Sequence, residues 1–455
     1  MRILLVSLNE ETLPDPVYPL GLACLAGTLK RRGHSCELMD LSLEGRGEPG
    51  LTASDFGPDL VAVSIRNIDN VAYPQSTTYI ADYTAFCHQL RQSVSCPVVL
   101  GGSGFSLYPE RIMAELGADY GIIGSGEGPL LELVESLEAG KEARRVHNLL
   151  WRENGTVLRN DLSETPLPDA PPDRDIEHLT EYVRLGGMAN IQTRRGCPLG
   201  CIYCSYPLIE GRCIRQRSID SVIEEIEELT ALGFRDLFFV DSVFNQPLEY
   251  SKALCSRILD RNLSVRWTCY ASPAPLDREA VELYKRSGCI GLEFGTDSLS
   301  RSMLHSLGKG FTPNDVQRAA ALCRKLELPH CHSILVGGPG ETADTLEETV
   351  LGLESLDPTA VIFMTGIRII PGTALHQTAR EEGLVDLETD MLEPVFYLSK
   401  TVQPDLDRWV RQLARHHKNW VFPGHSIRHS AALAARIRRN GIRGPLWLNF
   451  STLSR

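Results

Sequence analysis

The 455-residue sequence predicts an α/β protein with two sheet-containing domains and a small C-terminal region that is mainly helical. Short apolar runs rich in β-branched residues alternate with amphipathic helical segments through most of the chain, which is typical of parallel sheets. A proline-rich stretch over residues 161–175 interrupts this alternation, and the last residues of the chain carry a different charge. We therefore expect a domain at 1–150, a linker at 151–180, a domain at 181–385 and a C-terminal region at 386–455.

Five strands and two helices are expected in the first domain. The apolar segment Arg2–Val6 is the first strand, Leu20–Lys30 is a helix that ends before Gly33, and a second helix begins near Pro129. This alternation predicts a Rossmann-like, doubly wound parallel sheet, in which ligands bind beyond the carboxyl ends of the strands. The other expected strands are Ser35–Asp40, Leu60–Ser64, Pro97–Gly101 and Tyr120–Gly124.

The alternation resumes after the linker and predicts six β/α units. One helix is clear from its periodicity, because six apolar residues between Ile219 and Leu232 share one face and four glutamates lie opposite. Six units are enough for an open (β/α)6 barrel, whose chemistry is expected at the carboxyl ends of its strands. The expected strands are a segment near Thr193 and Leu237–Asp241, Val265–Tyr270, Gly291–Gly295, Ser333–Gly337 and Val361–Ile367.

Composition excludes several classes of protein. Acidic residues outnumber basic ones by 58 to 46, which argues against a general nucleic-acid binder, whose surface should be basic. No uncharged apolar run reaches the ~18 residues of a transmembrane helix, and the first apolar run is too short for a signal peptide. Thirteen cysteines in such a chain are more typical of thiols or metal ligands than of disulfides. The expected location is the cytoplasm.

The strongest functional signal is a group of three cysteines, Cys197, Cys201 and Cys204. Thiolates at this spacing can surround a compact inorganic core, and iron–sulfur clusters usually have four thiolate ligands. Three cysteines would leave one iron open to a group that the protein does not supply. A closed zinc site is the alternative, and it would need a fourth ligand such as Cys213.

The sequence Cys-x-x-x-Cys-x-aromatic-Cys after a strand resembles the radical S-adenosylmethionine enzymes. The resemblance covers about residues 185–385 and implies that Cys197, Cys201 and Cys204 hold a [4Fe–4S] cluster whose open iron binds S-adenosylmethionine. In that family the reduced cluster cleaves S-adenosylmethionine to methionine and a 5′-deoxyadenosyl radical. A flavodoxin- or ferredoxin-type protein is the expected electron donor.

Further segments match the same family. Gly295-Thr296-Asp297-Ser298 lies where relatives often have Gly-x-Glu-Ser, so Asp297 is expected to bind the ribose hydroxyls, with Glu293 as the second choice. Asp241 ends the second strand, and the alternative for it is a helix cap. A glycine-rich turn ends the fifth strand, and the alternative there is a tight connection without a ligand. The residues that the resemblance implies for S-adenosylmethionine binding are Tyr203, Asp241, Glu293, Asp297, Ser298, Gly337, Gly338 and Arg368.

The first domain resembles the cobalamin-binding domain that many radical S-adenosylmethionine enzymes carry. Glycines at the strand ends would leave room for the nucleotide tail of the corrinoid. The Asp-x-His-x-x-Gly sequence that supplies a histidine ligand to cobalt in the mutases is absent, as it commonly is in relatives with both domains. The alternative is a domain that keeps the fold without the cofactor. The residues implied for cobalamin binding are Leu20, Gly21, Ser64, Gly101, Gly102, Gly124, Gly126 and Glu127.

These resemblances imply a cobalamin-dependent radical S-adenosylmethionine methyltransferase. The 5′-deoxyadenosyl radical would abstract hydrogen from an unactivated carbon of a small-molecule or lipid substrate, and that carbon would take a methyl group from methylcobalamin. A second possibility is that the same cofactors drive a ring contraction, cyclisation or rearrangement without methylation. A third is a radical enzyme whose first domain is only a scaffold, and a fourth is a cobalamin-binding sensor with a structural metal site.

The C-terminal region is basic, with ten Lys or Arg from Arg408 to Arg455 and no acidic residue. One interpretation is that it closes the substrate cavity and attracts an acidic substrate. A second is peripheral contact with anionic lipid head groups, because Ala431–Ile437 is an apolar stretch among arginines. The third is a solvated helix that packs on the acidic body of the protein.

Overall fold

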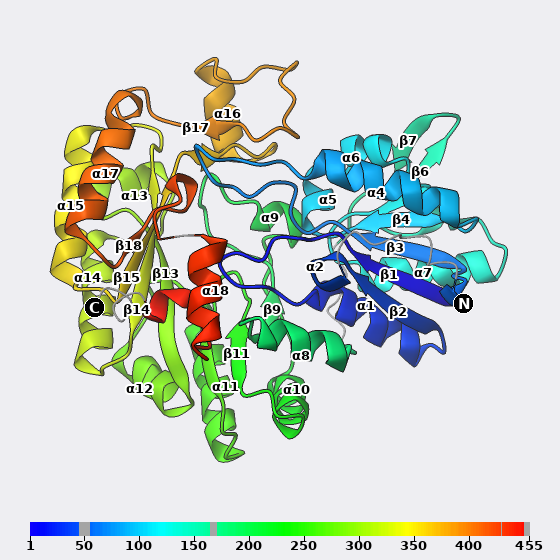
Figure 1. Ribbon diagram of the computed structural model, residues 1–455, viewed down its shortest axis with the longest axis horizontal. Helices are drawn as coiled ribbons and strands as arrows, with labels where there is room; N and C mark the ends of the chain where they lie inside the picture. Colours follow the sequence, from blue (N-terminus) through cyan, green and yellow to red (C-terminus); the bar gives the residue numbers. More distant parts are fainter. Residues whose placement is uncertain (45–54, 164–170, 429, 450–455) are drawn as a thin grey trace.

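The computed structural model describes residues 1–44, 55–163, 171–428 and 430–449. Two seven-stranded sheets lie side by side (Figure 1), one in the N-terminal half and one in the C-terminal half. The strand order is β2-β1-β3-β4-β5-β6-β7 in the first sheet and β18-β15-β14-β13-β12-β11-β8 in the second. This arrangement confirms the predicted α/β class, while part of the expected linker, 164–170, lies outside the described residues.

Five strands of the first sheet are parallel, and helices cover both of its faces. Ile3 and Leu5 pack against α1 and α7 on one face, whereas Leu4 and Val6 pack against α4 and α6 on the other. Burial on both faces explains why the strands are apolar throughout rather than alternating. The elements are β1 (Arg2–Ser7), α1 (Leu20–Arg31), β2 (Ser35–Asp40), α2 (Leu41–Glu44), β3 (Leu60–Ser64), α4 (Ile80–Ser93), β4 (Val98–Gly101), α5 (Ser103–Leu107), α6 (Pro109–Leu116), β5 (Tyr120–Ile122) and α7 (Glu127–Glu138).

An antiparallel hairpin that the sequence analysis missed completes this sheet. Its strands are β6 (Leu149–Glu153) and β7 (Thr156–Arg159), and β6 pairs with β5. Asn154 and Gly155 both have positive φ, 49° and 80°, as a two-residue hairpin turn requires. The first sheet thus extends past the boundary expected at residue 150, and α8 (Ile176–Arg184) begins within the expected linker.

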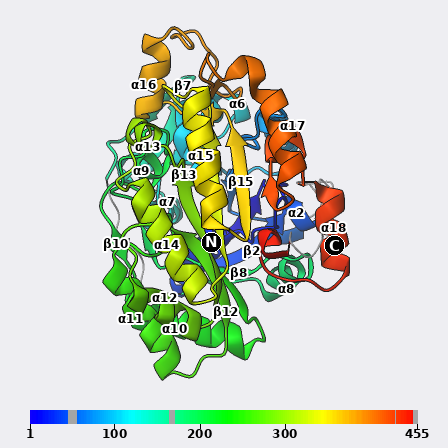
Figure 2. The same cartoon turned by 90° about the vertical axis from the view of Figure 1, so that its left-hand side faces the viewer.

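The second sheet contains the six predicted barrel strands, all parallel. Helices cover its outer face (Figure 2), and Trp267 and Cys269 of β12 pack beneath them, while Tyr270 lies on the opposite, inner face. The strands are β8 (Ala189–Ile191), β11 (Asp236–Phe239), β12 (Arg266–Ala271), β13 (Cys289–Asp297), β14 (His330–Val336) and β15 (Ala360–Thr365). The helices are α10 (Ile219–Ala231), α11 (Leu248–Asp260), α12 (Arg278–Arg286), α13 (Arg301–Ser306), α14 (Pro313–Lys325), α15 (Ala343–Leu356) and α16 (Ala374–Glu381).

One glutamate of α10 departs from the predicted amphipathic pattern. Glu225 is fully buried and pairs with Arg174 and Arg217. Short elements connect the units: β9 (Arg194–Arg195), α9 (Tyr206–Ile209), β10 (Arg215–Gln216), β16 (Ile367–Arg368) and β17 (Phe396–Tyr397).

The basic C-terminal region, expected as a separate unit, supplies the seventh strand of the barrel sheet. Strand β18 (Trp420–Val421) pairs with β15 in parallel, and α17 (Leu406–His416) packs on the same core. Further on, α18 (Ala431–Arg439) and Trp447 pack against Cys331 and Ala360 on the inner face, near the beginnings of the strands. No helix in the described part of the chain is long and apolar enough to cross a membrane.

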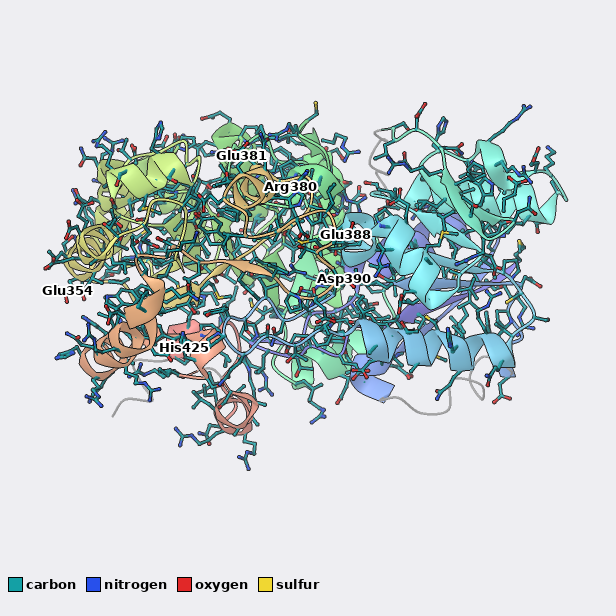
Figure 3. The ribbon with its side chains drawn as sticks, turned by 90° about the horizontal axis from the view of Figure 1, so that it is seen from above. Glu354, Arg380, Glu381, Glu388, Asp390 and His425 are labelled. Atoms are coloured by element: carbon teal, nitrogen blue, oxygen red, sulfur yellow. The ribbon has the colours of Figure 1, made fainter. Side chains whose placement is uncertain are left out.

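Segments of the first half reach the second half in two places. The loop after β1 extends to α18 (Figure 1), where Asp15 pairs with Arg438. Near the top of the molecule, Arg111 of α6 pairs with Asp390 at 3.2 Å, and Asp390 lies at the junction of the two halves (Figure 3).

Candidate functional site

A cavity of about 790 Å³ lies between the two sheets, at the carboxyl ends of β3, β4 and β5. All eight residues predicted for cobalamin binding line it: Leu20, Gly21, Ser64, Gly101, Gly102, Gly124, Gly126 and Glu127. The barrel half contributes predicted residues Tyr203, Cys204 and Arg368, together with Tyr206, Phe238, Tyr270, Leu335 and Met364. The fold therefore gathers most of the predicted residues around one space.

The glycines of the cavity wall are of two kinds. Gly102 has a φ of 101°, and a Cβ there would lie 2.6 Å from the carbonyl oxygen of Ile65, so the turn itself requires glycine. A Cβ on Gly21 would meet nothing within 4 Å. The space beside Gly21 is the kind that a bulky ligand such as a corrinoid needs, and the wall therefore fits cobalamin.

Glu127 lines the cavity, but its carboxylate is paired with a side chain of the protein. Its carboxylate accepts two hydrogen bonds from Arg195, at 2.9 and 2.6 Å. Burial alone would raise the pKa of Glu127, but the guanidinium of Arg195 holds that pKa below its usual range. The pair joins the start of α7 to β9, directly before the cysteine loop, so it links the two halves of the protein.

A hydrogen bond holds the backbone directly before the first cysteine of the loop. The backbone N–H of Gly196 donates to Glu210 at 3.1 Å. Burial raises the pKa of the Cys204 thiol to about 11, so this thiol would become a thiolate only on binding metal. In the described ranges no three His, Cys, Asp or Glu side chains converge on a point that could hold one ion.

Asp241 supports this loop and does not line the cavity. Both of its oxygens accept hydrogen bonds: from Thr193 N at 2.7 Å, from Thr193 Oγ1 at 2.6 Å and from Arg194 N at 3.2 Å. The side chain is fully buried, and burial raises its pKa. In place of the helix cap, the structure shows that Asp241 positions the strand that leads to Cys197, and its contact with S-adenosylmethionine stays a prediction.

Asp297, which was predicted to bind the ribose hydroxyls, lies beside the cysteine loop and has two protein partners. Lys309 Nζ lies 2.7 Å from its carboxylate, and the Tyr203 hydroxyl donates to the same oxygen. Lys309 also bonds the Cys201 thiol. Glu293 lies four residues earlier on β13, about 13 Å away along the strand, so Asp297 and Glu293 cannot serve one ribose.

Ser298, Gly337 and Gly338 make contacts within the protein. Ser298 Oγ bonds Thr349 Oγ1 at 2.8 Å. A Cβ on Gly337 would lie 2.2 Å from Leu398 Cδ1, so this turn has no room for a side chain. The N–H groups of Gly337 and Gly338 both donate to Glu341. These contacts agree with the tight-turn alternative, and the predicted cofactor contacts of these residues stay predictions.

Arg368 lines the cavity, but its guanidinium is engaged in holding the two halves together. Its Nε donates to Asp69 at 2.9 Å, and its Nη2 donates to the carbonyl oxygen of Met391 at 2.8 Å. Arg368 and Asp69 are both buried. The structure shows a buried ion pair between the halves for Arg368, and its contact with S-adenosylmethionine stays a prediction.

Sequence reasoning missed several polar residues near the site: Asp15, Arg66, Tyr206 and Tyr270. Arg66 and the two tyrosines line the cavity. Only Tyr270 had a usable signal, because its place at the end of an apolar strand puts it near the carboxyl edge of the sheet. Arg66 and Tyr206 lie in connections, where periodicity carries no information.

Comparison with known proteins identifies a known domain in each half of the chain. Residues 8–134 match the B12 binding domain, and residues 191–351 match the radical SAM superfamily. The chain is 30% identical to an uncharacterized methyltransferase of Pyrococcus horikoshii, covering 85% of this chain and 84% of the relative. It is 28% identical to the tryptophan 2-C-methyltransferase of Streptomyces laurentii, covering 82% and 74%.

A solved structure has the same architecture. The radical S-adenosylmethionine methyltransferase TsrM from Kitasatospora setae, with cobalamin and [4Fe–4S] cluster bound, superposes with a TM-score of 0.87 at 24% identity, over 100% of this chain and 98% of TsrM. The fold and the two matched domains define a radical S-adenosylmethionine enzyme with a B12-binding domain. The chain belongs to the cobalamin-dependent radical S-adenosylmethionine methyltransferases, which use a [4Fe–4S] cluster, S-adenosylmethionine and cobalamin. The hypothesis of a cobalamin-binding sensor is therefore wrong.

Proposed function

We propose that this enzyme methylates a carbon atom of a small molecule, which binds in the cavity against the inner face of the barrel. The observation that carries the proposal is that Cys204 and the glycine-bearing strand ends of the first sheet line the same cavity. When bound, the cofactors supply reductive cleavage of S-adenosylmethionine and a transferable methyl group. The Streptomyces relative is named for methylation of tryptophan, which supports a small-molecule acceptor over a lipid.

The net reaction replaces one C–H bond of the substrate by a C–CH3 bond. It consumes two S-adenosylmethionine molecules and two electrons, and it yields one molecule each of 5′-deoxyadenosine, methionine and S-adenosylhomocysteine. We propose a flavodoxin- or ferredoxin-type protein as the electron donor.

The residues of this chain position the reactants and exclude water. In the proposed assembly Cys197, Cys201 and Cys204 hold the cluster. Asp241 and Glu210 fix the backbone that leads into their loop, through Thr193 and Gly196. Leu335, Met364 and Phe238 form an apolar wall, and an apolar, closed site protects reactive species from solvent.

The test is anaerobic turnover of the reduced holoenzyme with candidate small molecules, followed by mass spectrometry. A product heavier by one methylene unit, together with S-adenosylhomocysteine, supports methylation. Formation of 5′-deoxyadenosine with neither of these products would support a rearrangement or cyclisation without methyl transfer instead.

A pair of cysteine variants tests the cluster assignment. Cys201→Ala should lose the cluster absorbance and all cleavage of S-adenosylmethionine while the chain still folds, because one of three ligands is missing. Cys213→Ala is the matched control, because Cys213 is exposed and should be dispensable. Retained cleavage in Cys201→Ala would contradict the assignment.

A further inference from the structure

Three polar side chains of neighbouring strands meet on the inner face of the barrel. Glu293 of β13 is in register with Tyr270 of β12, and Ser333 Oγ of β14 donates to Glu293 Oε1 at 3.0 Å. Glu293 and Ser333 are half-buried. Tyr270 keeps 41% of its surface accessible and lines the cavity. We call Tyr270, Glu293 and Ser333 the inner-face site.

Glu293 has an uncompensated carboxyl group. No ion pair to it is found in the described ranges, and Asp15, the acidic group that acts on it, has its own partner in Arg438. Burial raises the pKa of Glu293 to about 7, although the hydrogen bonds from Ser333 and Trp447 lower it. A carboxylate has about four acceptor positions, so two neutral donors leave it able to accept another hydrogen bond.

The surroundings of the inner-face site suit a flat ring. Phe238 and Tyr270 meet edge to face, with ring centroids 5.2 Å apart, and both line the cavity with Leu335 and Met364. The floor is closed by Trp447, which packs so closely that a Cβ on Gly291 would lie 2.6 Å from its ring. Aromatic and apolar walls around a few polar groups are typical of small-molecule sites.

We propose that the inner-face site binds the nitrogen-bearing end of a flat aromatic substrate, whose N–H group donates a hydrogen bond to the Glu293 carboxylate. The C-terminal region forms the floor of this site through Trp447. The inference rests on the proposed function only in taking the ligand as the methyl acceptor. Glu293 is then a substrate-binding residue and not, as predicted from the sequence, a residue that binds S-adenosylmethionine.

Binding to the oxidised holoenzyme, without reductant, tests this inference. The probes are indole and benzofuran, which differ in that oxygen replaces the N–H group. A hydrogen bond to a charged group contributes about 1.5–3 kcal/mol, or roughly 10- to 100-fold in affinity. Isothermal titration at pH 8.5, above the pKa of Glu293, should therefore show that wild-type enzyme binds indole at least about 10-fold more tightly than benzofuran.

Glu293→Met should remove this preference, because methionine has nearly the same length but no strong acceptor. Benzofuran affinity should stay the same, and the matched control Glu224→Met, on the exposed side of α10, should keep the wild-type preference. Ser333→Ala, which releases the Glu293 carboxylate from its hydrogen bond, should shift the preference without loss of the fold. Ser333→Ala decides the question if the methionine variant does not fold.

Equal affinity of wild-type enzyme for indole and benzofuran, or binding of neither probe, would overturn the inference. An unchanged preference in a folded Glu293→Met variant would do the same. These measurements need no methyl transfer. A persistent indole preference without methylated product would therefore contradict the proposed function alone, and methylation of substrates that lack an N–H group would contradict the inference alone.

Discussion

Single residues of the cavity wall have distinguishable roles. Gly102→Ala should destabilise the protein by about 1–3 kcal/mol, because the positive φ and the contact with Ile65 leave no room for a Cβ. Gly21→Ala should leave stability unchanged or raise it by up to about 1 kcal/mol, since it lies in the first turn of α1 with open space around it. Urea unfolding measures both effects. Equal losses in the two variants would contradict this distinction.

The buried histidine pair of β14 makes stability depend on pH. His330 Nδ1 lies 3.0 Å from His332 Nε2, and burial lowers the pKa of His330 to about 4 from its usual 6.5. Because the unfolded chain binds the proton more tightly, the contribution of His330 is complete above pH 6.5 and is lost as the pH falls toward 4.

Urea unfolding of wild type and of His330→Asn at two pH values tests this dependence. The difference in unfolding free energy between them should shrink by about 2 kcal/mol between pH 7.5 and pH 5. His88→Asn, on the exposed side of α4, is the control and should show no such change. A difference that stays constant with pH would mean that His330 is not buried in neutral form.

Residue-scale predictions from the sequence succeeded where the role depends on the backbone. The glycines and Ser64 at the strand ends all reached the cavity wall, because parallel strands end at one edge of the sheet. They did not reveal the protein partners of carboxylates and arginines, because these partners lie far away in the sequence. Arg368 meets a residue 299 positions earlier, and no local pattern records such a contact.

At the scale of elements, the C-terminal strand is an integral part of the barrel. Trp420 of β18 is 2% exposed and packs against Phe363 with ring centroids 5.1 Å apart. Trp420→Ala should therefore cost about 3–5 kcal/mol of unfolding free energy. Differential scanning calorimetry measures the effect. A change below about 1 kcal/mol, the usual size for surface sites, would instead indicate a separately packed tail.

The elements that sequence analysis missed are short or differ from the dominant pattern. Two residues of β18 are too few for any periodicity. The β6–β7 hairpin did have a signal, the Asn154-Gly155 turn, but the partly exposed β7 lacks the apolar run that marked the other strands. By contrast, β2 and β3 were predicted with their observed bounds, because they are continuous apolar or alternating segments between clear turns.

At the scale of the whole molecule, two buried ion pairs join the two halves, and all four of their residues line the cavity. Glu127–Arg195 connects α7 to the cysteine loop, and Asp69–Arg368 connects the loop after β3 to the end of the barrel. The cofactor-binding surfaces on the two halves must face each other for methyl transfer. The ion pairs therefore fix both the relative position of the halves and the base of the cluster loop.

Breaking this buried ion pair should lower the free energy of unfolding more than breaking an exposed ion pair does. Glu127→Gln leaves the buried Arg195 charge uncompensated, which costs about 3–5 kcal/mol. Asp390→Asn breaks the exposed pair with Arg111 (Figure 3) and should cost less than about 1 kcal/mol. Urea unfolding compares the two.

The double variant Glu127→Leu/Arg195→Met removes both charges and should recover most of the stability. If it were instead as unstable as Glu127→Gln, the loss would come from altered packing rather than from an unpaired charge.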